Sequence, residues 1–143
     1  MKYLSTYAEQ RANYINEFKG DELKENLDYL TREIRFCCKE LKCKEEDLII
    51  LMIDEFIWDY KDDSMVESIT GVNNYTQKYT DYCTYQGVGN IGKNGPRVCI
   101  ISDCGYTCYV FKATDYYNYC KNLSPLPSYN IMEFNRLIKD MTE

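Results

Sequence analysis

A glycine-rich stretch, residues 87–94, is the part of the sequence that most resembles a chemical motif. Its letters GVGNIGKN fit the pattern G-x-x-x-x-G-K of phosphate-binding loops and also contain G-x-G-x-x-G. In such a loop the glycine amides surround the phosphates, the lysine reaches them, and a Ser or Thr holds magnesium at the start of a helix. Here Asn94 replaces the Ser or Thr, and Gly95-Pro96 follows, which does not suit an ordinary helix start.

We therefore expect a long Gly-Asn hairpin loop in this stretch and not a nucleotide triphosphatase. Binding of a nucleotide-like anion is the alternative, because two bases lie close to the glycine amides in the sequence. Its candidate residues are Gly87, Gly89, Gly92, Lys93 and Arg97.

Neither cysteines nor acids form a catalytic signature. The eight cysteines contain no C-x-x-C pair and the chain has no histidine, so zinc-type spacing and the commonest general base are both missing. We expect structural thiols, no metal site, no cofactor and no catalytic residues. The D-x-K letters at Asp59-Tyr60-Lys61 resemble a nuclease core, but we expect them on a helix and interpret the match as chance.

Acidic residues are concentrated between Glu45 and Glu67. This segment holds nine acids and one base, a net charge of −8, whereas the whole chain has 17 bases and 23 acids, a net charge of −6. The rest of the chain therefore carries +2. A solvated helix face is the ordinary interpretation. The alternative is a surface that docks on a basic groove, made of Asp54, Glu55, Asp59, Asp62 and Asp63 and flanked by Tyr75, Tyr79, Tyr82 and Tyr85.

The acidic segment also contains the longest apolar run, Leu48 to Ile53, and the only tryptophan, Trp58. Residues 49, 52, 53, 56, 57 and 60 follow the spacing of a helix stripe, which predicts one helix through the segment. A buried strand over the six apolar residues is not excluded by periodicity, but the length and the continuation to Tyr60 favour the helix.

Two further helices are predicted before this segment. A stripe from Leu4 to Phe18 indicates the first, with Gly20 as its C-terminal cap and Asp21 as the cap of the second. The second helix has apolar residues at intervals of four and three, which form a seam that packs within the domain or across a dimer. The seam consists of Leu23, Leu27, Leu30, Ile34, Cys37 and Leu41.

After the acidic segment, Ser64 to Glu67 has the form of a capping box, which predicts a short helix ended by Gly71. From residue 72 the chain then changes in character. Tyr79 to Gln86 is predicted as a strand, and 97–102 with 106–112 as a hairpin. Both faces of that hairpin carry apolar residues, so we expect helices on both sides. A Pro-containing linker at 123–128 leads to an amphipathic helix at 129–142.

The expected architecture is therefore α+β in a single domain, 1–143: a helical N-terminal half at 1–71 packed on a small antiparallel sheet at 72–122, with a C-terminal helix at 129–142. No apolar segment is long enough to span a membrane, and the first residues lack the apolar run of a signal peptide. We expect a cytoplasmic protein. The fifteen tyrosines suit an interface, and compositional drift in an AT-rich genome is an equal explanation.

In general character (small, acidic, rich in Tyr and Asn, without a motif) the chain resembles phage-encoded inhibitors of host defence, including nucleic-acid-mimicking anti-CRISPR proteins. It equally resembles immunity proteins of toxin systems. Either resemblance implies a non-enzymatic protein whose partner is another protein with a basic surface, with no direct binding of nucleic acid or membrane. A phage-encoded protein would act in the cytosol of the host cell. A homodimer, and an oligomer that sequesters a nucleotide-like anion, are the alternatives.

Overall fold

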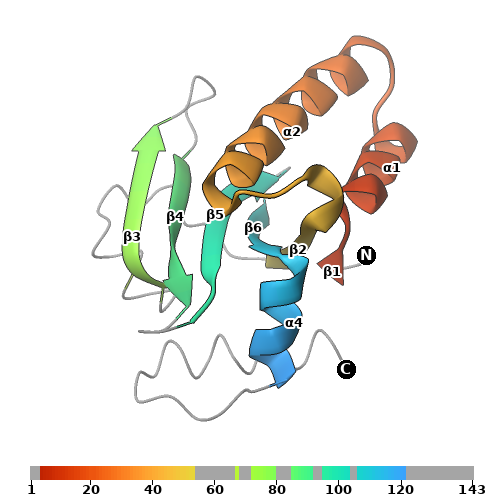
Figure 1. Ribbon diagram of the computed structural model, residues 1–143. Helices are drawn as coiled ribbons and strands as arrows, with labels where there is room; N and C mark the ends of the chain where they lie inside the picture. The colour runs from red at the N-terminus through yellow and green to blue at the C-terminus, as the bar shows by residue number, and fades with distance from the viewer. Residues whose placement is uncertain are drawn as a thin grey trace.

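A six-stranded antiparallel sheet organises the computed structural model, which describes residues 4–53, 67, 72–79, 85–91, 95–103 and 106–121 (Figure 1). The strand order is β1-β2-β6-β5-β4-β3. The strands are β1 (Leu4–Ser5), β2 (Leu48–Ile53), β3 (Val72–Tyr79), β4 (Tyr85–Ile91), β5 (Arg97–Asp103) and β6 (Tyr106–Lys112). The helices are α1 (Tyr7–Glu17), α2 (Gly20–Leu41), the short 3-10 helix η1 (Glu45–Asp47) and α4 (Ala113–Lys121). The α+β prediction is confirmed.

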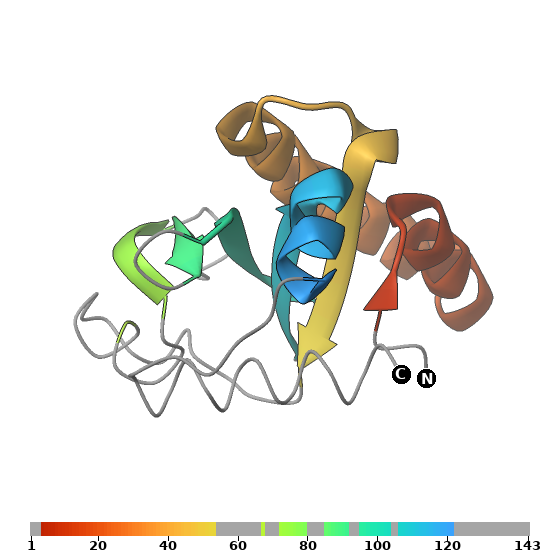
Figure 2. The ribbon, with the colours of Figure 1, turned by 60° about the horizontal axis from the view of Figure 1, so that its bottom comes forward.

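Helices cover the sheet on both faces, as the hairpin pattern predicted (Figure 2). In β5, Cys99 and Ile101 belong to the cluster that contains the buried residues of α1 and α2. Val98 and Ile100 belong to the other cluster, with Phe111 of β6 and Tyr116 of α4. The central strands therefore have apolar side chains on both faces, because neither face meets water.

The prediction of one helix through the acidic segment is wrong for the apolar run, because residues 48–53 form strand β2. This strand lies between β1 and β6 and pairs with both in antiparallel register. Leu48, Ile50 and Met52 pack toward α2, whereas Ile49 and Leu51 pack on the opposite face. A strand buried on both faces has a continuous apolar run instead of an alternating one. The alternative interpretation of this run, a buried strand, is the one that holds, and residues 54–66 lie outside the described part of the chain.

The two N-terminal helices exist, but their boundary differs from the prediction. Thr6 caps α1 in a capping box with Glu9, and α1 ends at Glu17. Gly20 does not cap α1; it is the first residue of α2, with a φ of 60°. Nor is Asp21 the N-cap of α2, since Lys19 occupies that position.

The apolar seam of α2 packs within the chain. Leu30, Ile34, Cys37 and Leu41 are buried against the sheet, and Leu23 and Leu27 pack at the edge of the same cluster. Of the two arrangements that the spacing allowed, the intramolecular one therefore holds. The opposite face of α2 is left exposed.

Two elements of the β-rich part differ from the prediction. The expected strand at 79–86 is wrong, because β3 ends at Tyr79 and β4 begins at Tyr85, with these two residues opposite one another. Residues 113–121, predicted as part of the β-rich region, form helix α4. Its Tyr, Thr and Asn residues are weak helix formers, and a stripe of Ala113, Tyr116 and Tyr119 holds it against the sheet.

Three further predictions fall mainly on residues outside the described ranges: the short helix at 64–71, of which Glu67 alone is described and helical, the linker at 123–128, and the helix at 129–142. Among the described residues, no helix has both the length and the apolar composition needed to cross a membrane.

Candidate functional site

The first half of the glycine-rich stretch lies in strand β4 and not in a loop. Residues 87–91 pair with β3 on one side, and residues 87–90 pair with β5 on the other. The expected hairpin loop is therefore wrong for this part, whereas Gly92, Lys93 and Asn94 lie outside the described residues. The next described element is β5, a strand, so the strand–loop–helix order of a phosphate-binding loop is not reproduced.

Gly87 and Gly89 make room for residues of the neighbouring strand β3, which pairs with β4. A Cβ atom at Gly87 would overlap the ring of Tyr75. At Gly89 it would lie 2.5 Å from Cγ1 of Val72 and 2.7 Å from the carbonyl oxygen of Asn73. The register of β3 shifts between Asn73 and Thr76, which brings this part of β3 over the glycines. Packing between the two strands accounts for both glycines.

Tyr75 belongs to the core and does not present its ring at the surface. It is 4% exposed; its amide donates a hydrogen bond to Oε1 of Glu67 at 2.8 Å, and its hydroxyl donates one to Oε1 of Gln77 at 3.4 Å. Tyr79 and Tyr85 are partners in the β3–β4 register, while Tyr82 lies outside the described residues. Tyr75 is therefore not part of an exposed tyrosine surface.

Arg97 joins the start of β5 to the end of α2. Its Nε donates a hydrogen bond to the carbonyl oxygen of Glu40 at 3.0 Å, and its terminal nitrogen forms an ion pair with Oε2 of Glu40 at 2.8 Å. This is a favourable place for a base, because the last carbonyls of a helix are partly negative. Arg97 points to the α2 side of the sheet, whereas Gly87 and Gly89 open on the other. The structure therefore does not bring the described residues of the anion-binding alternative together.

A buried carboxyl group that the sequence analysis missed lies between α2 and the sheet. Glu33 of α2 is 1% exposed and hydrogen-bonds with Gln86 of β4 and with Tyr29, one turn earlier in the helix. Its Oε2 atom has no hydrogen-bond partner. Burial raises the pKa of Glu33 to about 7, only partly offset by these two hydrogen bonds.

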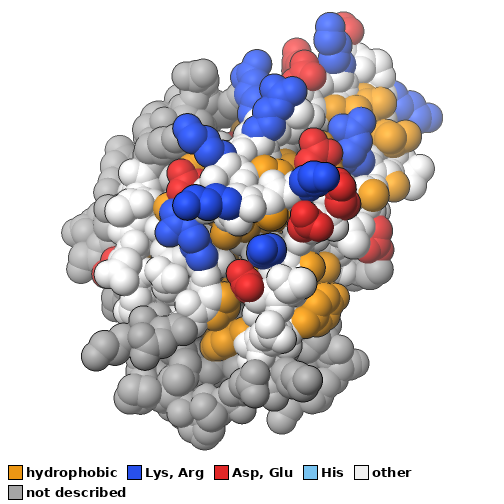
Figure 3. Space-filling view, viewed as in Figure 1, with side chains coloured by type: hydrophobic (Ala, Val, Ile, Leu, Met, Phe, Trp, Pro, Cys, Tyr) orange, Lys and Arg blue, Asp and Glu red, His pale blue; other side chains and the backbone are white. Residues whose placement is uncertain are grey.

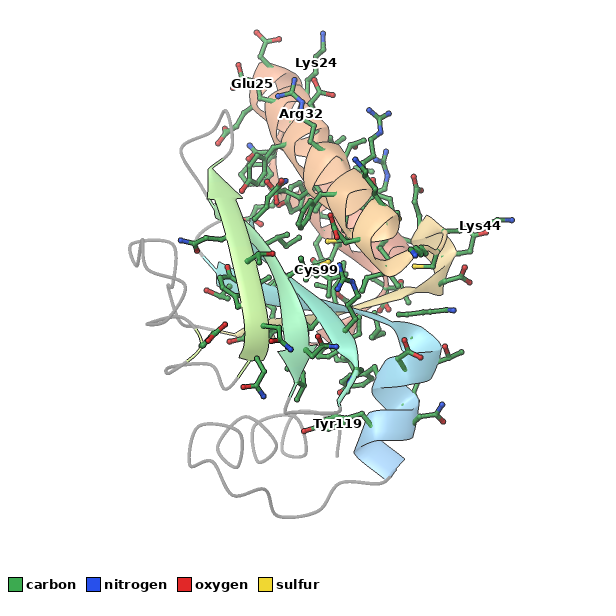
Figure 4. All side chains as sticks on the ribbon, turned by 60° about the vertical axis from the view of Figure 1, so that its left-hand side comes forward. Lys24, Glu25, Arg32, Lys44, Cys99 and Tyr119 are labelled. Carbon is green, nitrogen blue, oxygen red and sulfur yellow. The ribbon has the colours of Figure 1, made fainter. Side chains whose placement is uncertain are left out.

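Two cysteines lie next to this carboxyl group. Cys37 follows Glu33 by one helical turn and shares a hydrogen bond with Cys99 of β5, which lies beneath α2 (Figure 4). Both thiols are fully buried, and burial raises the pKa of Cys37 well above its ordinary value. The five described cysteines with placed side chains, Cys37, Cys38, Cys43, Cys99 and Cys108, are free thiols.

The buried cluster of Glu33, Gln86, Cys37 and Cys99 can hold a proton but cannot meet a substrate. A general base must reach the proton that it removes, and a cysteine nucleophile must be a thiolate. Here the carboxyl is sealed, and the pKa of partly exposed Cys38 is raised to about 11 by burial. A charged residue inside an apolar seam, three positions after Leu30 and one before Ile34, is the sequence signal that could have identified Glu33.

Of the nine acids between Glu45 and Glu67, the structure describes Glu45, Glu46, Asp47 and Glu67. Glu45, Glu46 and Asp47 are exposed on η1, and the carboxylate of Asp47 accepts a hydrogen bond from the amide of Lys44. Asp54, Glu55, Asp59, Asp62 and Asp63 lie outside the described residues. The face dominated by α2 carries side chains of both signs (Figure 3). Within the described ranges, no group of three or more His, Cys, Asp or Glu residues is placed to hold a metal ion.

In comparisons with known proteins, no family model, curated protein or solved structure matches the chain.

Replacing Gly87 by Ala should destabilise the fold through Tyr75. The added methyl group must displace a buried ring, which costs about 1–3 kcal/mol of unfolding free energy in an overpacked core. In a Tyr75→Leu background the same replacement should cost much less, because the overlapping ring atoms are gone. Chemical denaturation of the four proteins in this double-mutant cycle measures the coupling. An equal cost of Gly87→Ala in both backgrounds would contradict the packing role.

Replacing Glu33 by Gln should remove a pH dependence of stability. Between the ordinary pKa of 4.5 and about 7, the folded protein keeps a proton that the unfolded chain loses. Wild-type stability should therefore fall as the pH rises through this window, by up to about 3 kcal/mol, and level off above it. Glu33→Gln is neutral throughout, so it should match wild type near pH 4 and exceed it at pH 8. Urea denaturation at several pH values tests this; parallel curves for the two proteins would exclude a buried carboxyl that titrates near neutrality.

Proposed function

We propose that the protein is a non-enzymatic inhibitor that uses its acidic segment, residues 45–67, to occupy a basic site on a partner protein. The observation that carries this proposal is the distribution of charge. One segment of the chain holds a net charge of −8, while all other residues together carry +2. Such a concentration of one sign steers association with a surface of the opposite sign.

The position of this segment in the fold supports the proposal. The segment begins with three exposed acids on η1, enters the sheet as the buried strand β2, and leaves it at Ile53. The apolar residues of β2 anchor it in the sheet between the edge strand β1 and β6. The acids on either side of β2 in the sequence are therefore attached to a buried strand, which is a rigid base for a binding surface.

A basic groove that normally binds nucleic acid is the site that best fits this charge. Such grooves carry Lys and Arg at the spacing of phosphates, and closely placed carboxylates can replace the phosphates. The inhibitors of host defence and the immunity proteins that the chain resembles share this chemistry. They differ in the partner, a defence nuclease or a toxin, so the identity of the captured partner distinguishes the two.

Neutralising five acids should weaken partner binding while the fold stays intact. The variant Asp54→Asn, Glu55→Gln, Asp59→Asn, Asp62→Asn and Asp63→Asn keeps side-chain shape and removes five charges. The free energy of unfolding should stay the same or rise slightly, because the repulsion between neighbouring like charges, about 0.2–0.5 kcal/mol per pair, disappears. Each desolvated charge pair that is lost with the partner should cost about 2–5 kcal/mol of binding free energy.

The partner is first captured from the host with wild-type protein, and its dissociation constant is then measured at several salt concentrations. A matched control removes five exposed acids outside the segment, Glu17, Asp21, Glu22, Glu25 and Asp115. We expect a shallower salt dependence and weaker binding for the first variant and a smaller change for the control. Unchanged affinity and an unchanged salt slope for the first variant would refute docking by the acidic segment.

A further inference from the structure

Five bases gather around the C-terminal end of α2. Arg35 and Lys39 are exposed on the last two turns of the helix, and Lys42 is exposed at the residue that follows it. Arg97 lies at the start of β5, and Lys112 lies at the end of β6. Figure 3 shows Lys and Arg side chains collected over this end of the helix. We call these five residues the basic patch.

The pairing of β5 with β6 brings two of the five bases together. The antiparallel register of the two strands extends to the neighbours of Arg97 and Lys112, so these two bases follow it as adjacent residues. Residues two positions further along each strand pack against α2, and alternate residues of a strand share a face. Burial is the main cause that raises the pKa of Cys43, the second residue after α2, and the charge of Lys112 acts in the opposite direction. The ammonium group of Lys112 therefore lies near the end of the helix.

The bases on α2 are not balanced within the helix. Opposite charges three or four residues apart pair on a helix surface, a spacing that Asp28 and Arg32 satisfy, so Arg32 is not counted in the patch. Arg35 and Lys39 have only Thr, Arg, Phe, Lys and Cys residues at these spacings. Within the described part of the chain, their side chains join no other residue in a hydrogen bond or ion pair. Both charges are therefore left to solvent or to a partner.

The one acid in the last two turns of α2 is already occupied. The carboxylate of Glu40 pairs with Arg97 at 2.8 Å, and the side chain of Arg97 remains 45% exposed. The patch thus holds five bases against one acid, a net charge of +4. The helix dipole favours bases in the last turn only, so it does not account for Arg35. Moreover, Arg35 and Lys39 are like charges four residues apart and repel one another, a cost that a bound anion would offset.

The composition of the patch favours a phosphate backbone over a protein as its partner. Protein interfaces have an apolar core, but the large apolar side chains that are exposed in the described part, Ile15 and Tyr117, lie on α1 and α4. A nucleic acid needs only bases that neutralise its phosphates, and Lys and Arg gathered on one face are its electrostatic footprint. We propose that the basic patch binds the sugar-phosphate backbone of a nucleic acid without reading its sequence.

The acids that border the patch limit the strength of this contact. Together with burial, the charges of Asp47 and Asp115 raise the pKa of Cys43, so both acids lie close to the same end of α2. The affinity should therefore be in the range of sequence-independent binding, with a dissociation constant of about 10⁻⁴ to 10⁻⁶ M. An inhibitor that enters a nucleic-acid-binding groove with its acidic segment would then hold the displaced nucleic acid with its bases. Binding by the isolated protein does not depend on that role.

Fluorescence anisotropy of a short labelled DNA duplex tests the proposal. Four or five phosphate contacts predict a slope of log affinity against log salt of about −4, so binding should weaken about 100-fold between about 50 and 200 mM salt. Lys39→Gln with Lys42→Gln should reduce the magnitude of this slope by about 2 and weaken binding about tenfold or more. The control, Lys19→Gln with Lys24→Gln, removes two exposed lysines from the other end of α2 and should change the affinity much less. Duplexes of different sequence should bind alike.

Several results would overturn the proposal. One is wild type that leaves the anisotropy unchanged up to about 0.5 mM at low salt, where electrostatic contacts are strongest. Another is an equal loss of affinity in the two double variants, which would reduce the effect to net charge. Polyglutamate that binds as tightly as DNA would assign the patch to an acidic protein surface. If the Lys39 and Lys42 variant does not fold by circular dichroism, Arg35→Gln with Lys112→Gln replaces it.

The same assay separates this proposal from docking by the acidic segment. The variant that neutralises Asp54, Glu55, Asp59, Asp62 and Asp63 should bind DNA at least as tightly as wild type, because five charges that repel phosphates are gone. Its loss of the captured partner would therefore leave DNA binding in place. Weaker DNA binding by this variant would contradict a contact made by the basic patch.

Discussion

Burial of the central strands on both faces is the constraint on which this fold depends. Strands β2, β5 and β6 have helices on either side, so the residues in the middle of each strand must suit an apolar environment. This requirement explains why β2 is an unbroken run of six apolar residues and why Val98, Cys99, Ile100 and Ile101 follow one another in β5. It also explains why a carboxyl group that intrudes, Glu33, is held by hydrogen bonds from Gln86 and Tyr29 and retains a proton near neutral pH.

The same constraint decides which elements the sequence alone could predict. The α2 seam and the β5–β6 hairpin were predictable, because a helix with one buried face and a hairpin with a tight connection have distinctive local patterns. Strand β2 was not, because apolar periodicity cannot separate a strand buried on both faces from a buried helix. Its neighbours along the chain happened to continue a helical spacing, and only the pairing with β1 and β6 resolves the ambiguity. Helix α4 was missed because tertiary contacts of Tyr116 and Tyr119 outweigh its weak intrinsic helix propensity.

The glycine-rich stretch shows how a motif can arise from packing. Glycine is required at positions 87 and 89 because Tyr75 and Val72 of the neighbouring strand occupy the space that a side chain would need there. Their spacing of two residues is the spacing of one face of a strand, and it coincides with the first two glycines of G-x-G-x-x-G. Arg97, which appeared to complete an anion site, binds the end of α2 from the opposite face of the sheet. The sequence around these residues does not indicate on which face of the sheet each of them lies.

Charge is distributed unevenly along the chain. On the outer face of α2 the exposed acids Asp21, Glu25 and Asp28 are balanced by the exposed bases Arg32, Arg35 and Lys39, so this face contributes no net charge. Residues 45–67 hold a net charge of −8 instead. Because β2 lies inside this segment and pairs with both β1 and β6, the strand that supplies apolar residues to both faces of the sheet also connects the acids that precede it in the sequence to those that follow it.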